Sequence, residues 1–273
     1  MANNPFPGWK WFLTTVLGTT VSILMTFGTS ALIERHQRNK DRKMSALMVM
    51  SNIESFAREM DRQAQDLTRR DSSARWLLSM PLEALEKAPA ELFDEPLQEV
   101  IYLSIISHDK TAENIFSNNI ETWKNMGNVN FIDNVGKCFS DMNWIEEYWN
   151  SQVSEYDEDF GQVRKHPENY PGNSMPSKYL QNMTIRQKCG RIHSMVDWFE
   201  FNAATLRQSN RRNMDYIGIT EKEVMEFTNR RTIQMENEEK ALRRTDFQKP
   251  TLSFDSLYTM RDRTEKVKEY LKK

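Results

Sequence analysis

The segment from Trp11 to Ile33 contains no charged side chain. As an α-helix rising about 1.5 Å per residue it would be roughly 34 Å long, enough to cross the hydrocarbon core of a bilayer. Trp9 and Trp11 stand at its start, where amphipathic rings prefer the headgroup level. We therefore predict a transmembrane helix at residues 11–33, after a short head at residues 1–10, with the lipid bilayer as a partner.

A cleaved signal peptide is the alternative interpretation of this segment. Thr29, Ser30 and Ala31 resemble a small-residue cleavage site. The apolar run is longer than the roughly 7–15 residues of a signal peptide, and Lys10 is the one basic side chain before it. The sequence therefore favours a membrane helix that is retained.

A basic juxtamembrane collar at residues 34–43 follows the apolar segment. Its cations are Arg35, Arg38, Lys40, Arg42 and Lys43. An excess of basic residues marks the cytoplasmic side of a membrane helix, and each cation gains about 1 kcal/mol beside anionic lipids. We expect these five side chains to contact lipid headgroups. We also expect a single-pass protein of a bacterial inner membrane with its large domain in the cytoplasm.

Small residues recur every four positions in the apolar segment and so share one face of the helix. They are Thr14, Gly18, Ser22, Thr26 and Ser30. Such a face allows two helix backbones to approach closely. We predict helix packing at Gly18, Ser22, Thr26 and Ser30, and a homodimer through the membrane helix. The alternative is that small residues are simply frequent in membrane helices.

The remaining composition excludes several classes of protein. The 273 residues include 37 Lys and Arg against 39 Asp and Glu, a formal net charge of −2, and the mean hydropathy is −0.72. A general nucleic-acid binder needs a sustained positive field, so we expect no nucleic-acid partner. Cys138 and Cys189 are too few for a disulfide framework, and we expect reduced thiols.

A coiled-coil seam follows the collar, with apolar positions alternately three and four residues apart. The seam consists of Ala46, Val49, Ile53, Phe56, Met60, Gln63 and Leu67. No Pro or Gly lies between Gly28 and Pro81, so the membrane helix is expected to continue into the seam. In the alternative interpretation, the seam is merely the core face of the first helix of the domain.

Prolines interrupt the next part of the chain. Pro81, Pro89 and Pro96 predict that residues 69–96 are mostly loop with one or two helical turns. Pro96 is suited to the first position of a helix. The apolar residues of the helix that Pro96 would begin are Leu97, Val100, Ile101, Leu103, Ile105 and Ile106. The β-branched content of this run leaves a strand as the alternative.

Helical patterns continue to the end of the chain. We predict helices over 111–126, ending at Gly127, and from 129 to an acidic run at 155–159, followed by a linker at 161–176 that is rich in Gly and Pro. A third stripe consists of Ile192, Met195, Val196, Phe199, Ala203 and Leu206.

Two more helices complete the predicted fold. Thr220 and Glu223 predict a capping box at the start of a helix that ends near 244, and the last helix follows Pro250. The predicted fold is all-α: a transmembrane helix followed by an antiparallel helical bundle with halves at 44–160 and 177–273.

The segment FSNNIETWKNMGNVNFIDN at 116–134 resembles a recurring segment in a family of uncharacterised bacterial single-pass membrane proteins. The matching residues are Glu121, Thr122, Trp123, Lys124, Gly127, Asn128, Val129, Phe131, Ile132 and Asn134. The resemblance implies the same layout, a membrane helix followed by a polar helical domain, and no assigned activity. Family members usually carry a basic head before the membrane helix, which favours the opposite orientation. Structurally, Gly127 would turn the corner, Asn128 would cap the next helix and Ile132 would pack.

Motifs for catalysis or cofactor binding are absent from the sequence. It contains no glycine-rich phosphate loop, zinc-protease helix or nucleophile elbow. Cys189 and His193 could share a metal, but two further ligands would be needed, so we expect none. The acidic run at 155–159 lacks the spacing of a calcium loop. We therefore expect no catalytic, cofactor-binding or metal-binding residues.

These features favour a membrane-anchored helical interaction, scaffold or signalling module with an unknown protein partner. One alternative is an accessory subunit of a transport or envelope complex. A membrane-bound hydrolase or metal-dependent enzyme is the less favoured one.

Overall fold

The computed structural model describes the backbone of residues 7–118, 123, 128–243 and 259–272, and the side chains of 36–118, 123, 128–238 and 259–272. All regular elements in these ranges are helical, which confirms the predicted all-α class. The elements are α1 (Pro7–Ser79), α2 (Leu82–Lys87), α3 (Glu91–Ile101), α4 (Lys110–Asn118), α6 (Val129–Lys165), η1 (Pro167–Asn169), α7 (Met175–Gln181), α8 (Met183–Gly190), α9 (Ile192–Ile217), α10 (Glu221–Arg243) and α11 (Met260–Leu271).

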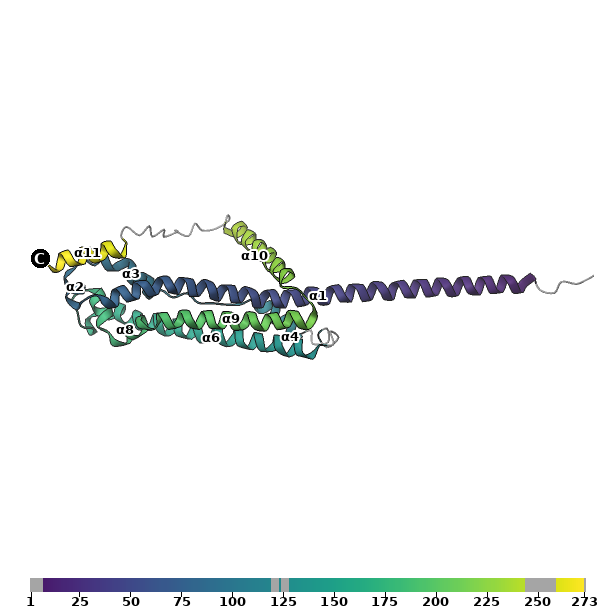
Figure 1. Ribbon diagram of the computed structural model, residues 1–273, viewed down its shortest axis with the longest axis horizontal. Coiled ribbons are helices and arrows are strands. Elements are labelled where there is room, and N and C mark those ends of the chain that lie inside the picture. Colours follow the sequence, from purple (N-terminus) through teal and green to yellow (C-terminus); the bar gives the residue numbers. More distant parts are fainter. Residues whose placement is uncertain (1–6, 119–122, 124–127, 244–258, 273) are drawn as a thin grey trace, which may run out of the picture.

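Helix α1 is the central helix of the bundle, and most of the other helices pack against it. It is continuous over 73 residues, and its N-terminal part extends beyond the bundle (Figure 1). The prediction of one uninterrupted helix from the apolar segment into the bundle is therefore confirmed. The predicted loop from residue 69 is wrong, because α1 continues to Ser79 with Ala74 and Leu77 buried in the core.

The predicted transmembrane segment at 11–33 lies in the part of α1 whose side chains are outside the described residues. Its place in a bilayer therefore stays a prediction. Among the helices with described side chains, none combines the length and the apolar character that crossing a membrane requires.

Helices α1, α6 and α9 run side by side and form the main bundle (Figure 1). Asn210 of α9 donates to the Met50 carbonyl of α1 over 2.9 Å, whereas His193, near the start of α9, lies 3.6 Å from Asp71. The chain therefore runs along α9 in the direction opposite to its direction along α1. The two helices are antiparallel, as the bundle prediction requires.

The coiled-coil seam on α1 is buried along its whole length. Its members are Ala46, Val49, Ile53, Phe56, Met60, Gln63 and Leu67. From α6 and α9, Trp149 and Phe199 meet edge to face with ring centroids 4.7 Å apart. Burial of these apolar faces removes a large hydrocarbon area from water and holds the three helices together.

The predicted linker at 161–176 is shorter in the structure. Helix α6 continues through the acidic run and through Gly161 to Lys165, because Tyr156, Phe160 and Val163 remain on its buried face. The segment between α6 and α7 contains the short 3₁₀ helix η1 and is otherwise irregular, and α7 starts at Met175. Buried residues from both predicted halves belong to one hydrophobic cluster.

The prediction that Pro96 occupies the first position of a helix is wrong. Helix α3 begins at Glu91, so Pro96 lies in its interior rather than at its first position. Proline has no N–H to donate to the carbonyl four residues before it, which here belongs to Leu92. Arg263 of α11 supplies the missing donor, with its Nη1 2.7 Å from the Leu92 oxygen. The Leu92 carbonyl of α3 is thus one contact point of α11, which also packs against α2.

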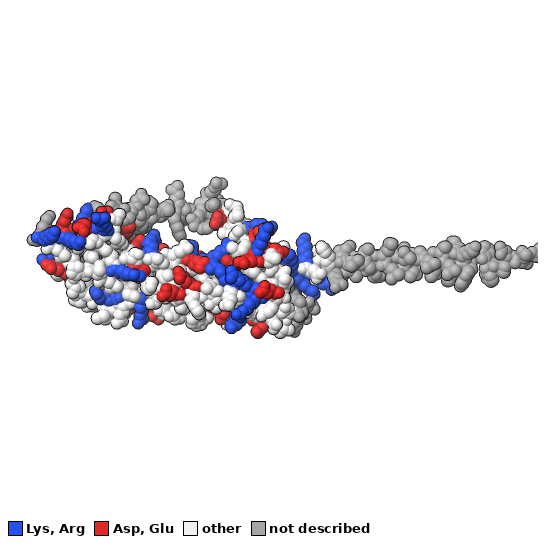
Figure 2. Space-filling model, in the orientation of Figure 1, with Lys and Arg blue, Asp and Glu red and all other residues white. Residues whose placement is uncertain are grey.

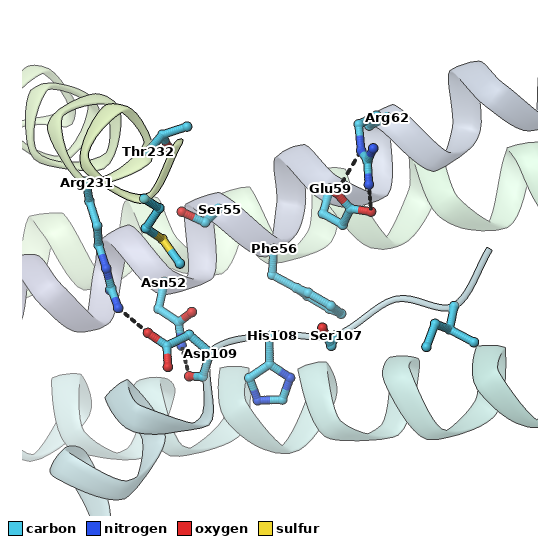
Figure 3. Close-up of a pocket in the computed structure, with 12 residues that line it drawn as sticks. Asn52, Ser55, Phe56, Glu59, Arg62, Ser107, His108, Asp109, Arg231 and Thr232 are labelled. Carbon is cyan, nitrogen blue, oxygen red and sulfur yellow. Dashed lines mark hydrogen bonds and ion pairs between the residues drawn. The ribbon is translucent and has the colours of Figure 1, made fainter. Parts of the chain in front are cut away.

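The helix expected to continue through Ile106 ends at Ile101. Residues 102–109 run as extended chain between α1 and α6 (Figure 3). The strand-like alternative was the better description of the β-branched run around Ile105 and Ile106. The reason lies in α6, whose side chains bind the backbone of this segment, as described below.

Both predicted helix caps are present. The Asn128 side chain accepts from the Phe131 N–H over 3.1 Å at the start of α6. At the start of α10, Glu223 N–H donates to Thr220 Oγ1, and the Glu223 carboxylate accepts from the Thr220 N–H. This reciprocal pair is a capping box.

The capping box makes the stability of α10 dependent on pH. The side chain of Lys43, followed by the backbone and side chain of Thr220, lowers the pKa of Glu223 from 4.5 to about 2. Because the pKa is lower in the folded state, the stabilisation is fully present above pH 4.5 and is lost as the pH falls towards 2. We expect Glu223→Gln to lower the melting temperature at pH 7, and the difference from the wild type to disappear near pH 2. Thermal unfolding across this range measures both.

Glu226→Gln is the matched control, because it removes a carboxylate from the same helix outside the capping box. A Glu223→Gln difference that stays constant from pH 7 to pH 2 would contradict the assignment.

Candidate functional site

A pocket of about 370 Å³ lies between α1, the extended segment 102–109 and α10. Figure 3 shows it with α1 behind and α10 at one end. Its lining residues come from these three elements, which are far apart in the sequence. They are Asn52, Ser55, Phe56, Glu59, Arg62, Ile105, Ser107, His108, Asp109, Arg231, Thr232 and Met235.

The α1 wall of the pocket results from the helical repeat of the seam. Residues three or four apart share a face of a helix, so Asn52, Ser55, Glu59 and Arg62 form a polar row beside the buried seam. Phe56 belongs to the seam itself and presents an apolar surface between these polar groups. The wall is thus polar at both ends and apolar in the middle.

The opposite wall is the extended segment 102–109. Side chains of α6 hold this segment by hydrogen bonds to its backbone. Asn150 accepts from the Ile106 N–H over 3.0 Å and donates to the Ile106 carbonyl over 2.9 Å. Trp149 Nε1 donates to the Ser104 carbonyl over 2.8 Å. One side-chain amide thus makes the two bonds that a neighbouring strand would make, which explains why the segment is extended without belonging to a sheet.

His108 fixes the end of this wall. Its imidazole is fully buried, with Nδ1 2.6 Å from Glu146 of α6 and Nε2 3.2 Å from Glu113 of α4. Its backbone N–H also donates to Glu146, and its ring meets Phe56 edge to face at 5.5 Å. The ring is a polar bridge between α4 and α6, and it stiffens the segment beside the pocket.

Asp109 closes one end of the pocket. Its carbonyl accepts from Asn52 of α1 over 2.9 Å, and its carboxylate forms an ion pair with Arg231 of α10 (Figure 3). Burial raises the pKa of Asp109, but hydrogen bonds from Thr111 and the charge of Arg231 outweigh burial, so the pKa lies below its usual value. Asp109 therefore stays ionised and ties α10 to the bundle.

A second ion pair stands at the other end of the pocket (Figure 3). The Arg62 guanidinium donates to both oxygens of Glu59 over 2.6 and 2.8 Å, a bidentate arrangement. With Arg231 and Asp109, the pocket carries two cations and two anions. Its formal charge is therefore balanced. Figure 2 shows acidic and basic side chains interspersed over the face of the bundle that it draws.

Of the five side chains predicted to contact lipid headgroups, the structure describes those of Arg38, Lys40, Arg42 and Lys43. The side chain of Arg35 is not described, and neither are the side chains at the predicted packing positions Gly18, Ser22, Thr26 and Ser30, so these predictions stay untested. Arg38 and Lys40 are exposed on α1 where its described side chains begin, and Arg42 is half-buried.

Lys43, the last cation of the collar, forms an ion pair within the protein. Its Nζ lies 2.5 Å from the Glu223 carboxylate, so this cation of the collar connects α1 to α10. Lys43 therefore has a partner within the protein, which distinguishes it from a side chain that faces lipid alone.

The two cysteines are free and buried. Burial raises the pKa of Cys138 to about 12 and that of Cys189 to about 11, so neither is a reactive thiolate at neutral pH. Cys189 and His193 lie on different helices, α8 and α9. The described part of the chain contains no group of three or more His, Cys, Asp or Glu residues that could hold a metal ion.

The segment at 116–134 has a structural role where it is described. Trp123 is buried, with its ring centroid 5.1 Å from that of Phe116 and 6.0 Å from that of Phe131. Asn134 donates to Asn213 over 2.8 Å. Gly127 lies outside the described residues, so the predicted corner stays a prediction.

Sequence reasoning missed the pocket as a site. The available signals were the β-branched run at 105–106 and the polar pair His108 and Asp109 that follows it. The contact of Arg231 with Asp109 had no signal in the sequence, because the two residues are more than a hundred positions apart.

Comparison with known proteins gives no assignment. None of the models of known protein families matches this chain, and neither a curated protein nor a solved structure matches it. The resemblance at 116–134 stays a prediction.

Proposed function

We propose that the protein is a membrane-anchored helical interaction module. Its apolar segment at 11–33 crosses a bacterial inner membrane, and its bundle lies in the cytoplasm, in keeping with the basic collar. The observation that carries the proposal is the continuity of α1, which joins the apolar segment to the bundle without a break. A rigid helix of this kind links the position of the bundle to that of the membrane segment.

The pocket supports an interaction role for the bundle. Its α1 wall lies on the same helix as the apolar segment, so a partner bound there would touch the anchor helix directly. In this proposal the bundle recruits the partner to the membrane surface. Self-association through Gly18, Ser22, Thr26 and Ser30 would bring two such modules together.

Fractionation of the full chain tests the anchor. Leu17→Arg combined with Leu24→Arg places two charges in the apolar segment, each costing about 3 kcal/mol at the centre of a membrane helix. We expect the wild type to stay with membranes after carbonate extraction and the double variant to be released. Gln37→Arg with Asn39→Arg is the matched control, because it adds the same charge to an exposed part of α1.

A reporter fused after Lys273 tests the orientation. We expect activity from a reporter that works only in the cytoplasm. Activity only from an external reporter on a membrane-bound chain would reverse the proposed orientation. A soluble external product would show that the apolar segment is a signal peptide.

A further inference from the structure

The extended segment 102–109 has two edges, and only one is occupied. In an extended chain the N–H and C=O of one residue point to the same side, and those of the next residue point to the opposite side. Backbone groups of Ser104, Ile106 and His108 are bound by side chains of α6. The backbone groups of the residues between them therefore face away from α6.

The second edge faces the pocket. Asp109 shows its direction, since its carbonyl accepts from Asn52 on the α1 wall. Across the part of the chain that the structure describes, the N–H and C=O groups of Ile105 and Ser107 have no hydrogen-bond partner in the protein. Both residues line the pocket and are exposed, Ile105 to 68%. Two residues with open backbone groups, spaced two apart, form the edge of an unpaired strand.

The space beside this edge suits another stretch of extended chain. From Asn52 to Arg62 the α1 wall is about 15 Å long, which equals four to five residues of extended polypeptide. An apolar side chain of such a peptide would meet Phe56, which lines the pocket between the polar groups of α1. The two balanced ion pairs at the ends favour a peptide without a strong net charge.

We propose that the pocket binds an extended peptide segment of a partner protein, which adds a strand to the open edge at Ile105 and Ser107 and places an apolar side chain against Phe56. Main-chain hydrogen bonds would provide affinity, and the contact with Phe56 would provide selectivity, as in other cases of strand addition. This inference rests on the proposed role of the bundle as an interaction module and does not depend on the membrane anchor.

A phage-displayed library of random heptapeptides, panned on the full chain in nanodiscs, supplies the probe. We expect peptides with a central apolar residue and little net charge to be enriched over empty nanodiscs. Their affinity is then compared between Ser107→Pro and Ser104→Pro. Proline at 107 removes an N–H that faces the pocket, whereas proline at 104 alters the edge that faces Trp149.

The expected result is binding about tenfold weaker for Ser107→Pro, the equivalent of one lost hydrogen bond, with Ser104→Pro close to the wild type. Circular dichroism shows whether each variant is folded. If Ser107→Pro does not fold, the wild type is measured against N-methylated copies of the best peptide. Methylation at one set of alternate residues should abolish binding, and methylation at the other set should preserve it.

Two results would overturn the proposal. One is the absence of any enriched peptide. The other is binding that neither Ser107→Pro nor N-methylation of the peptide weakens, since the peptide would then bind elsewhere or without strand pairing. Failure of the membrane anchor is distinguishable, because a chain recovered in the soluble fraction can be panned without nanodiscs and can still pass or fail the peptide test.

Discussion

Replacing Phe199 by alanine is expected to lower the free energy of unfolding by about 4 kcal/mol. The ring is fully buried in α9, where it meets Trp149 edge to face at 4.7 Å and Trp198 at 5.0 Å. Truncation removes the aromatic contacts and leaves a cavity between α6 and α9. Urea unfolding of the full chain, followed by tryptophan fluorescence and by circular dichroism, measures the loss.

Phe201→Ala is the matched control on the same helix. Phe201 is 71% exposed, so its truncation should change the free energy of unfolding by less than about 0.5 kcal/mol. Equal losses for the two variants would show that the α6 and α9 interface is not the packed core described above.

Replacing Arg263 by alanine is expected to cost about 3 kcal/mol of stability. Its guanidinium is buried, donates to the Leu92 carbonyl over 2.7 Å and forms an ion pair with Glu95. Removal leaves a carbonyl inside α3 without its donor and a carboxylate without its cation. Urea unfolding measures the cost, with Arg261→Ala as an exposed control on the same helix.

A double-mutant cycle with Pro96→Ala tests whether Arg263 stabilises the protein by supplying the hydrogen-bond donor that Pro96 lacks. Alanine at 96 restores the N–H that can donate to the Leu92 carbonyl within α3. Arg263→Ala should therefore cost about 1 kcal/mol less in the Pro96→Ala background than in the wild type. Additive costs would mean that Arg263 does not compensate for the proline.

The seam on α1 shows why much of the fold could be predicted. Every one of its predicted positions is buried, because an α-helix repeats every 3.6 residues and spacings of three and four keep side chains on one face. The caps at Asn128 and Thr220 were also predictable, since each is made by residues within three positions of one another. Interactions of this range depend on the local sequence alone.

Two predictions failed because a distant element changed the local outcome. Pro96 lies inside α3 because Arg263, far along the chain, supplies the donor that proline lacks. Residues 102–109 are extended because Trp149, Asn150 and Glu146 of α6 bind their backbone. Propensity is a weak guide where tertiary hydrogen bonds compete with those of a helix.

By itself the sequence determined the all-α class, the unbroken helix from the apolar segment into the bundle, the buried seam and the two capped helix starts. Periodicity and short-range hydrogen bonds specify these features, and both can be recognised in the printed residues. Only the tertiary structure decided the pocket, because its α1 wall, its open edge at Ile105 and Ser107 and its closing ion pair of Asp109 with Arg231 come from three distant segments. No spacing in the sequence encodes their meeting, which depends on how α6 and α10 pack around α1.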